Sequence, residues 1–106
     1  MDSEPSYLAS YGELATLKNA IGCWYHQDAY LDFNEDAEIW ASMWAGYDGA
    51  GQRRLVNQLE QLLSRSDAEV LSVWNAESHA FRFDDGAEAR EFLDSMLASF
   101  KGQPNC

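Results

Sequence analysis

Two histidines and a nearby carboxylate are the residues of this chain whose types could support catalysis or metal binding. His26 lies two residues before Asp28, and His79 lies far along the sequence. A histidine beside a carboxylate can act as a general acid or base, and two imidazoles with a carboxylate can hold a divalent metal. A small metal-dependent hydrolase built on these three residues is therefore one hypothesis, and it ranks behind two binding functions.

The alternative interpretation of the same residues is structural. Asp28 would accept backbone amides in a loop, and a neighbouring group would fix His26. No HExxH, CxxC, P-loop or GxGxxG motif accompanies them. We therefore predict that the chain is not an enzyme, has no catalytic residue, and holds no metal and no cofactor.

The overall charge of the chain limits its partners. The 106 residues include 18 acidic and 7 basic residues, which gives a formal net charge of −11. So acidic a chain repels nucleic-acid phosphates and anionic membrane surfaces. We therefore expect neither direct nucleic-acid binding nor membrane binding.

One long stretch has acidic and aromatic residues but no cation. Between Asn19 and Gln52 there is no Lys or Arg. Aromatic residues dominate protein–protein hot spots, and a field of one sign steers an oppositely charged partner. The predicted partner contacts in this stretch are Asp28, Tyr30, Asp32, Glu35, Asp36, Glu38, Trp44 and Asp48. The alternative is a solvated acidic surface over aromatic residues that only fill the core.

The elements that must position these residues are helices. Apolar residues recur at three- and four-residue steps, which predicts a compact all-α bundle of about five amphipathic helices. We expect a single domain over residues 1–106, with an ordered core of about residues 6–101. The expected helices are Ser6–Gly22, Glu35–Ala45, Gly51–Arg65, Asp67–Asn75 and Gly86–Lys101. Residues 23–33 are expected to be irregular or briefly helical, and residues 79–83 could be extended.

Local signals predict where these helices begin and end. Side chains that can accept a hydrogen bond from an unpaired amide favour helix starts, and glycine favours helix ends. The expected helix starts are Asn34, Ser66 with Glu69 as a capping box, and Asp84 or Asp85. The expected stops are Gly22 for the first helix and a loop with glycines 46, 49 and 51 after the second.

The ends of the chain and its cysteines bear on location. The first five residues are acidic rather than basic, and no apolar run approaches the ~20 residues of a membrane span. Cys23 and Cys106 are too few for a disulfide scaffold, so we expect free thiols in a reducing cytoplasm, with Cys23 buried as a small apolar residue.

Several segments resemble one protein family. The Tyr-Phe-His-Gln-Asp signature of small immunity proteins of contact-dependent growth inhibition systems is similar to the segment Cys23-Trp24-Tyr25-His26-Gln27-Asp28. The family's leucine-rich helix, followed by a Ser-x-x-Glu helix start, is similar to residues 58–63 and 66–71. Its final helix, in which an Arg precedes a large apolar pair, is similar to Arg90-Glu91-Phe92-Leu93. The likeness covers about residues 8–100.

The resemblance implies a helical cytoplasmic protein without enzymatic activity. Such a protein binds and blocks the C-terminal toxin domain that a neighbouring cell delivers, and many of these toxins are nucleases. We expect a basic nuclease that acts on RNA. The signature residues Tyr25, His26, Gln27 and Asp28 are expected to be structural. The alternative function is an acidic helical adaptor or regulator that uses the same surface for a partner other than a toxin.

Overall fold

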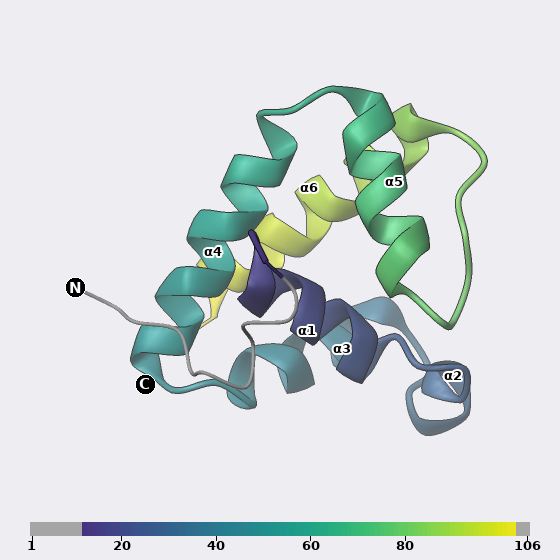
Figure 1. Cartoon of the computed structure of the whole chain (residues 1–106). Helices are drawn as coiled ribbons and strands as arrows, with labels where there is room; N and C mark the ends of the chain where they lie inside the picture. Colours follow the sequence, from purple (N-terminus) through teal and green to yellow (C-terminus); the bar gives the residue numbers. More distant parts are fainter. Residues whose placement is uncertain (1–11, 104–106) are drawn as a thin grey trace.

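The computed structural model describes residues 12–103 and shows an all-α domain, as predicted (Figure 1). The helices are α1 (Ala15–Trp24), α2 (Ala29–Asp32), α3 (Asp36–Ala45), α4 (Gly49–Leu63), α5 (Asp67–Glu77) and α6 (Gly86–Gly102). Within these residues there is no strand, and residues 78–85 connect α5 to α6 without regular structure. No helix of this part of the chain is long and apolar enough to cross a membrane.

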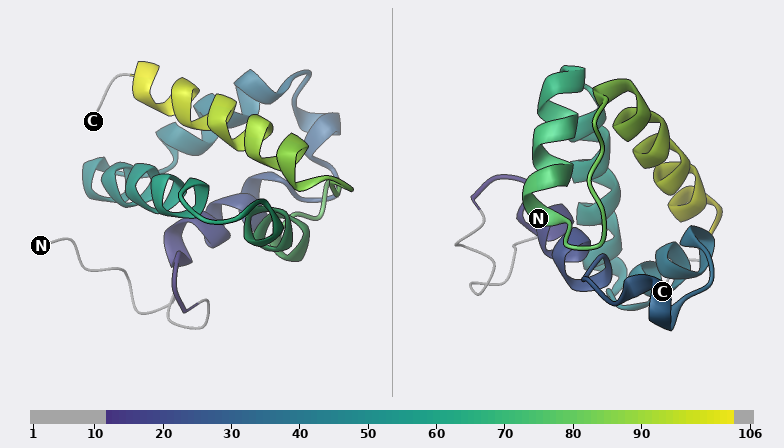
Figure 2. Two further views of the ribbon diagram at one scale, coloured as in Figure 1. Left: turned by 90° about the horizontal axis from the view of Figure 1, so that it is seen from above. Right: turned by 90° about the vertical axis from the view of Figure 1, so that its right-hand side faces the viewer.

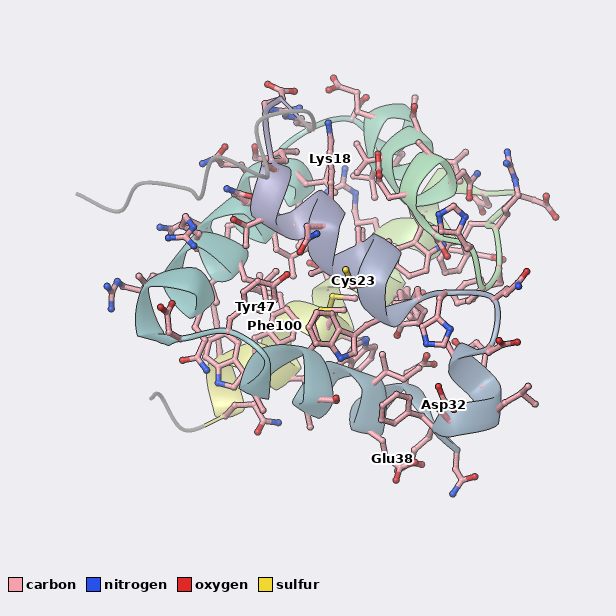
Figure 3. All side chains as sticks on the ribbon, turned by 60° about the horizontal axis from the view of Figure 1, so that its bottom comes forward. Lys18, Cys23, Asp32, Glu38, Tyr47 and Phe100 are labelled. Carbon is pink, nitrogen blue, oxygen red and sulfur yellow. The ribbon has the colours of Figure 1, made fainter. Side chains whose placement is uncertain are left out.

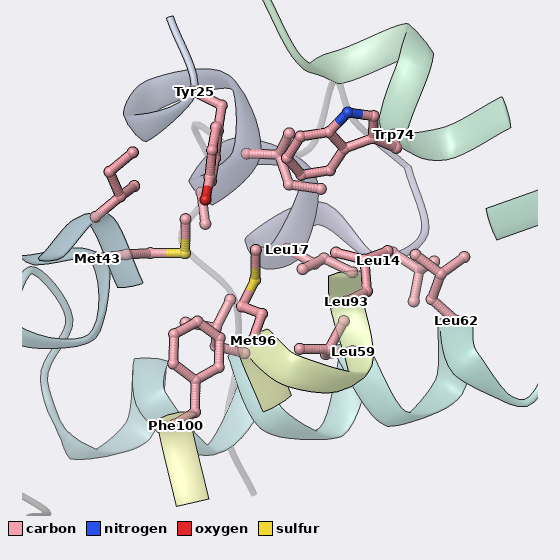
Figure 4. Close-up of a cluster of buried hydrophobic side chains, with 14 of the residues drawn as sticks. Leu14, Leu17, Tyr25, Met43, Leu59, Leu62, Trp74, Leu93, Met96 and Phe100 are labelled. Atoms are coloured by element: carbon pink, nitrogen blue, oxygen red, sulfur yellow. The ribbon is translucent and has the colours of Figure 1, made fainter. Parts of the chain in front are cut away.

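One hydrophobic core lies between the helices. The helix α6 packs against α3, α4 and α5, and α1 packs against α4 and α5 (Figure 2). Figure 4 shows the centre of this core, where side chains of different helices meet. Its fully buried members include Leu17, Ile21, Met43, Leu59, Trp74, Leu93, Met96 and Phe100. Burying one such large apolar side chain contributes about 1.5–3 kcal/mol, so this core is the main source of stability.

Two buried glutamines of α4 form hydrogen bonds with backbone groups at the start of α1 and near the end of α3. Leu14 precedes α1 in a left-handed conformation, with φ 57°, and provides no side-chain cap. The side chain of Gln58 on α4 instead accepts the backbone amide of Leu17 at 2.9 Å, in the first turn of α1. Gln52 donates to the carbonyl oxygen of Trp44 at 2.9 Å, near the end of α3. Helix ends expose unpaired backbone groups, and α4 therefore satisfies an amide of α1 and adds a second donor to the Trp44 carbonyl, which also accepts the Tyr47 amide at 3.3 Å.

Arg90 on α6 holds the connection between α4 and α5. Its Nε donates to the Asp67 carboxylate at 2.5 Å, and its two terminal nitrogens donate to the carbonyl oxygens of Leu63 and Arg65. These carbonyls belong to the end of α4, where no further helical amide is available. The planar guanidinium presents its donors in a rigid fork, so it reaches three separate acceptors at once, whereas the three donors of a lysine radiate from one nitrogen.

Some predicted helix boundaries are confirmed and others are wrong. The Ser66 hydroxyl accepts the Glu69 amide at 3.2 Å and starts α5, which is one half of the predicted capping box, while the Glu69 carboxylate lies 3.7 Å from Arg65. The Asp85 carboxylate accepts the Ala87 amide at 2.9 Å and starts α6. The first helix begins at Ala15 rather than Ser6, and residues 6–11 lie outside the described part. It continues through Gly22 to Trp24.

The predicted start of α3 is wrong, and the predicted glycine loop is confirmed only at Gly46, which is the C-cap residue of α3 after Ala45. Glu35, not Asn34, is the N-cap residue of α3. Gly49 and Gly51 lie in the first turn of α4, because the Asp48 side chain accepts the Gly51 amide at 2.8 Å and starts the helix there. A capping carboxylate stabilises a helix start enough to outweigh the low helix propensity of glycine.

The two cysteines have different outcomes. Cys106 lies outside the described residues. Cys23 is exposed on α1, so the prediction that it is buried is wrong. Its neighbour Trp24 and the more distant Ile21 contact the interior instead, and position 23 falls on the solvent side of the helix.

Candidate protein-binding surface

The signature-like segment begins with a core residue. Tyr25 is fully buried, and its ring meets the Trp74 ring edge-on with centroids 4.9 Å apart. Its carbonyl oxygen accepts the backbone amide of His79 at 2.8 Å. Tyr25 thus joins the end of α1 to α5 and to the segment that follows α5.

His26 and Asp28 are joined by a local hydrogen bond, but the acceptor is the His26 side chain and not, as predicted, the Asp28 carboxylate. The backbone amide of Asp28 donates to Nδ1 of His26 at 3.1 Å, and the Asp28 carboxylate caps nothing. Nε2 of His26 lies 3.6 Å from an oxygen of Asp32. Nδ1 therefore acts as a hydrogen-bond acceptor, and Nε2 faces the Asp32 carboxylate. Gln27 is exposed.

The described residues 12–103 contain no cluster of side chains that could hold a metal ion. No three His, Cys, Asp or Glu side chains of that range lie close enough together to hold a metal ion. His26, Asp28 and His79 therefore do not form the site that the hydrolase hypothesis needs. The contact that His79 makes to this region is the one from its backbone amide to Tyr25.

One carboxylate holds two tyrosines. An oxygen of Asp36, in the first turn of α3, accepts the hydroxyl of Tyr25 at 3.0 Å and that of Tyr30 at 2.7 Å. Burial, followed by the negative charge of Asp36, raises the pKa of Tyr25 well above its usual range. Burial and the hydrogen bond to Asp36 raise the pKa of Tyr30 in the same way. Asp36 therefore ties α2 and the end of α1 to the start of α3.

Three other predicted contact residues, Glu35, Glu38 and Asp48, serve as helix caps. The Glu35 side chain accepts the backbone amide of Glu38, the third residue of α3. The Glu38 carboxylate accepts the backbone amides of Asn34 at 2.9 Å and Glu35 at 3.2 Å, at the start of α3. Asp48 caps α4. Because α3 has ten residues, Asp48 lies beyond its far end, about 15 Å from Asp36. Asp48 is therefore separate from the acids around α2.

Trp44 is not a surface residue, which corrects its prediction as a partner contact. It is only 5% exposed, and its ring stacks on Phe100 with centroids 5.3 Å apart. The periodicity of α3 places Trp44 on the face that packs against α6. A tryptophan on an apolar helix face fills the core here, as tryptophans most often do.

The remaining residues form a compact surface around α2, which lies at one corner of the molecule (Figure 1). We call it the α2 surface and define it by six exposed residues: Asp28, Tyr30, Leu31, Asp32, Glu35 and Glu38. Figure 3 shows Asp32 and Glu38 at this corner, with Lys18 on the opposite side of the molecule. The half-buried Asp36 lies beneath it.

Leu31 is the member of the α2 surface that the sequence analysis missed. In the described part of the chain, the two exposed large hydrophobic side chains are Leu31, 84% exposed, and Tyr30, 45% exposed. A sequence signal for Leu31 does exist. Ala29 is buried and Phe33 is packed on the core, four residues apart, so the residue midway between them must point away from the core.

The ion pairs that Lys101 and Arg65 form lie away from the α2 surface. Lys101 lies 3.0 Å from Glu60, and Arg65 lies 2.6 Å from Glu13, whose pKa it lowers. Among residues 12–103, no Lys or Arg forms an ion pair with an acid of the α2 surface. No described Lys or Arg therefore neutralises the four carboxylates of that surface, although those of Glu35 and Glu38 also accept backbone amides at the start of α3.

A shallow open hollow borders the α2 surface. It has a volume of about 390 Å³ and is lined by residues 78–82. The ring of Phe81, one of its walls, lies 6.2 Å from the ring of Tyr30. Arg82 is exposed at the same hollow, so the acidic character ends here. The α2 surface thus has an acidic side and a more neutral aromatic side.

No protein-family model, curated protein or solved structure matches this chain. The described residues offer exposed carboxylates and apolar side chains, and this combination is suited to binding a cationic protein.

Proposed function

We propose that this chain is an immunity protein of a contact-dependent growth inhibition system. It binds the C-terminal toxin domain of the cognate effector, a basic nuclease that acts on RNA, and neutralises it without catalysis. The observation that carries the proposal is the α2 surface, where four carboxylates unpaired with Lys or Arg surround Tyr30 and Leu31 in the described structure.

The physical basis is competition for cations. A nuclease that holds RNA needs Lys and Arg side chains to contact phosphates. An inhibitor with carboxylates at a similar density attracts the same cations, and its net charge of −11 accelerates the encounter. Aromatic and aliphatic side chains then exclude water and lengthen the lifetime of the complex. An immunity protein must act before damage accumulates, so rapid association is useful to it.

A co-expression experiment tests the proposal. The toxin domain encoded by the reading frame next to the gene for this chain is expressed in a sensitive host, alone and with this chain. We expect full protection from that toxin domain and none from unrelated toxin domains. Growth arrest that this chain does not relieve would reject the immunity function. A chain that binds another cellular protein and gives no protection would instead be the adaptor of the alternative hypothesis.

A variant pair links protection to the α2 surface. The triple variant Asp28→Lys, Asp32→Lys, Glu35→Lys reverses two acids whose carboxylates cap no helix, and Glu35, whose side chain shares the capping box of α3 with Glu38. Thermal unfolding of this variant beside the control therefore checks that it is folded. The matched control reverses three exposed acids on or just before α6: Asp84, Glu91 and Asp94. Both variants have the same net charge. We expect the first to lose protection and the second to keep it, and equal protection by both would place the binding site elsewhere.

A further inference from the structure

We propose that Leu31 is the anchor of the α2 surface: its side chain enters an apolar pocket of the partner protein, and Lys and Arg side chains rim that pocket. The inference rests on the proposed function, since it concerns the same surface and the same class of partner. In this proposal Leu31 sets the lifetime of the complex. The partner surface that fits Leu31 is an apolar pocket with a cationic rim.

The exposure of Leu31 is the first observation. Its side chain is 84% exposed, whereas the other leucines of the described helices are buried or packed on the core. A leucine in this position contributes nothing to the core, and it leaves apolar area in contact with water. Burial of that area by a partner is favourable because it removes apolar surface from water.

The second observation is that the backbone beneath Leu31 is held firmly. Its amide donates to the carbonyl of Asp28 at 3.0 Å, and the amide of Phe33 donates to that of Ala29 at 3.0 Å. Ala29 is fully buried, and the hydroxyl of Tyr30 is bound to Asp36 at 2.7 Å. A partner therefore does not have to order this backbone, so less of the burial energy of the Leu31 side chain is lost to ordering.

The third observation is the chemistry around Leu31. Asp28 and Asp32 lie within one helical turn of it, and Glu35 follows. A partner surface that was apolar throughout would take these carboxylates out of water without pairing them, which is costly. The partner pocket must therefore have cations at its rim. A second copy of this chain cannot provide them, because it would bring the same acidic surface with a net charge of −11.

This arrangement separates two roles. The carboxylates act at a distance, so they control the association rate and its dependence on salt. Leu31 acts only on contact, so it controls the dissociation rate. A truncation of Leu31 should then weaken binding while the salt dependence stays as it is in the wild-type chain.

The experiment compares two probes by surface plasmon resonance: the toxin domain of the adjacent reading frame, and polylysine, which offers charge without an apolar pocket. For the toxin domain, we expect Leu31→Ala to raise Kd about tenfold or more, as for a hot-spot residue, mainly through dissociation. Leu31→Met, which keeps an apolar side chain of similar volume, should stay within about threefold of the wild-type chain. Leu71→Ala, a matched truncation on the half-buried face of α5, should leave Kd unchanged. Polylysine should bind Leu31→Ala and the wild-type chain equally.

The outcomes separate this inference from the proposed function. If Leu31→Ala binds the toxin domain as tightly as the wild-type chain while the triple acid reversal binds weakly, the anchor role is wrong and the proposed function stands. An equal loss of polylysine binding on truncation would also contradict an apolar pocket. If the wild-type chain does not bind the toxin domain, both are wrong. Because Leu31 is so exposed, its truncation should leave the thermal unfolding of the chain unchanged, which confirms that the variant is folded.

Discussion

Replacing Asp36 with alanine removes one carboxylate that serves two tyrosines. That carboxylate accepts the hydroxyl of the fully buried Tyr25 at 3.0 Å and the hydroxyl of the partly exposed Tyr30 at 2.7 Å. It also lies in the first turn of α3, at the positive end of the helix dipole. The substitution should therefore loosen the support of the α2 surface and destabilise the whole domain.

The magnitude follows from the burial of the two hydroxyls. A buried donor that loses its partner costs about 1–3 kcal/mol, and this applies to Tyr25. The Tyr30 side chain is 45% exposed, so its hydroxyl can turn to water and costs about 0.5 kcal/mol or less. Loss of a favourable charge at the helix start adds about 0.3–1 kcal/mol. We expect Asp36→Ala to lower the free energy of unfolding by about 3 kcal/mol.

Urea unfolding, followed by circular dichroism, measures this change. Asp36→Asn keeps an oxygen acceptor and should recover about half of the loss, because hydrogen bonds to neutral groups are about half as strong as those to charged groups. Asp28→Ala is the matched control, since the Asp28 carboxylate is exposed and caps nothing, and it should change stability by at most about 0.5 kcal/mol. An Asp36→Ala chain as stable as the Asp28→Ala chain would refute the role assigned to this carboxylate.

Two further predictions concern stability. The pKa values of Tyr25 and Tyr30 are raised in the folded chain, so on raising the pH the unfolded chain loses these two protons first. The two tyrosines therefore stabilise the folded state fully below about pH 10, and this contribution is lost as the pH rises above that value. A tyrosinate absorbance titration should show both phenols ionising only as the chain unfolds, and ionisation of both in the folded chain near pH 10 would contradict their environment. Gly86→Ala should destabilise the chain, because a Cβ there would lie 2.6 Å from the carbonyl oxygen of Asp67, whereas Gly102→Ala meets nothing within 4 Å. Thermal unfolding compares the two, and a Gly86→Ala chain as stable as the Gly102→Ala chain would contradict the close approach of α5 and α6.

The sequence predicted the helices because burial imposes their periodicity. In α6, the residues Ala89, Leu93, Met96 and Phe100 recur at three- and four-residue steps, and all four are fully buried. Local capping chemistry was also readable where a side chain bonds an amide within its own helix turn, as Ser66 does. Such signals depend on neighbours in the sequence, so a single sequence contains them.

Features that depend on distant residues were not readable. The first turn of α1 is completed by Gln58, which is 41 positions from Leu17, and no local pattern predicts that bond. An aromatic stripe likewise does not reveal which of its members face a neighbouring helix, so Trp44 was assigned to the surface although it stacks on Phe100.

The acidic composition of the sequence indicated the candidate surface, but not which of its carboxylates accept hydrogen bonds within the fold. Asp36 and Glu38 have acceptor roles toward tyrosine hydroxyls and backbone amides. Asp28 has no such role for its carboxylate. A charge pattern treats these residues alike, because it contains no information about hydrogen-bond geometry. The structure therefore separates Asp28, whose carboxylate caps no helix, from Glu35 and Glu38, which share the capping box of α3.

Reversal of Asp28, Asp32 and Glu35 changes the electrostatic attraction to a cationic partner by a definite amount. A carboxylate in water about 7 Å from a partner cation contributes about 0.6 kcal/mol, and its reversal to Lys changes the interaction by twice that amount. Three reversals then cost about 3.5 kcal/mol before salt screening and about 1.5 kcal/mol at physiological ionic strength. The latter corresponds to a loss of affinity of slightly more than tenfold.

The most direct measurement is therefore the Kd for the toxin domain of the adjacent reading frame, determined across a range of salt concentrations. It is compared between the wild-type chain, the triple reversal at Asp28, Asp32 and Glu35, and the control reversal on and before α6. We predict that the triple reversal raises Kd more than tenfold and flattens its salt dependence, while the control changes Kd far less. A triple reversal with an unchanged Kd would show that the toxin domain, if bound at all, is held by another part of the molecule.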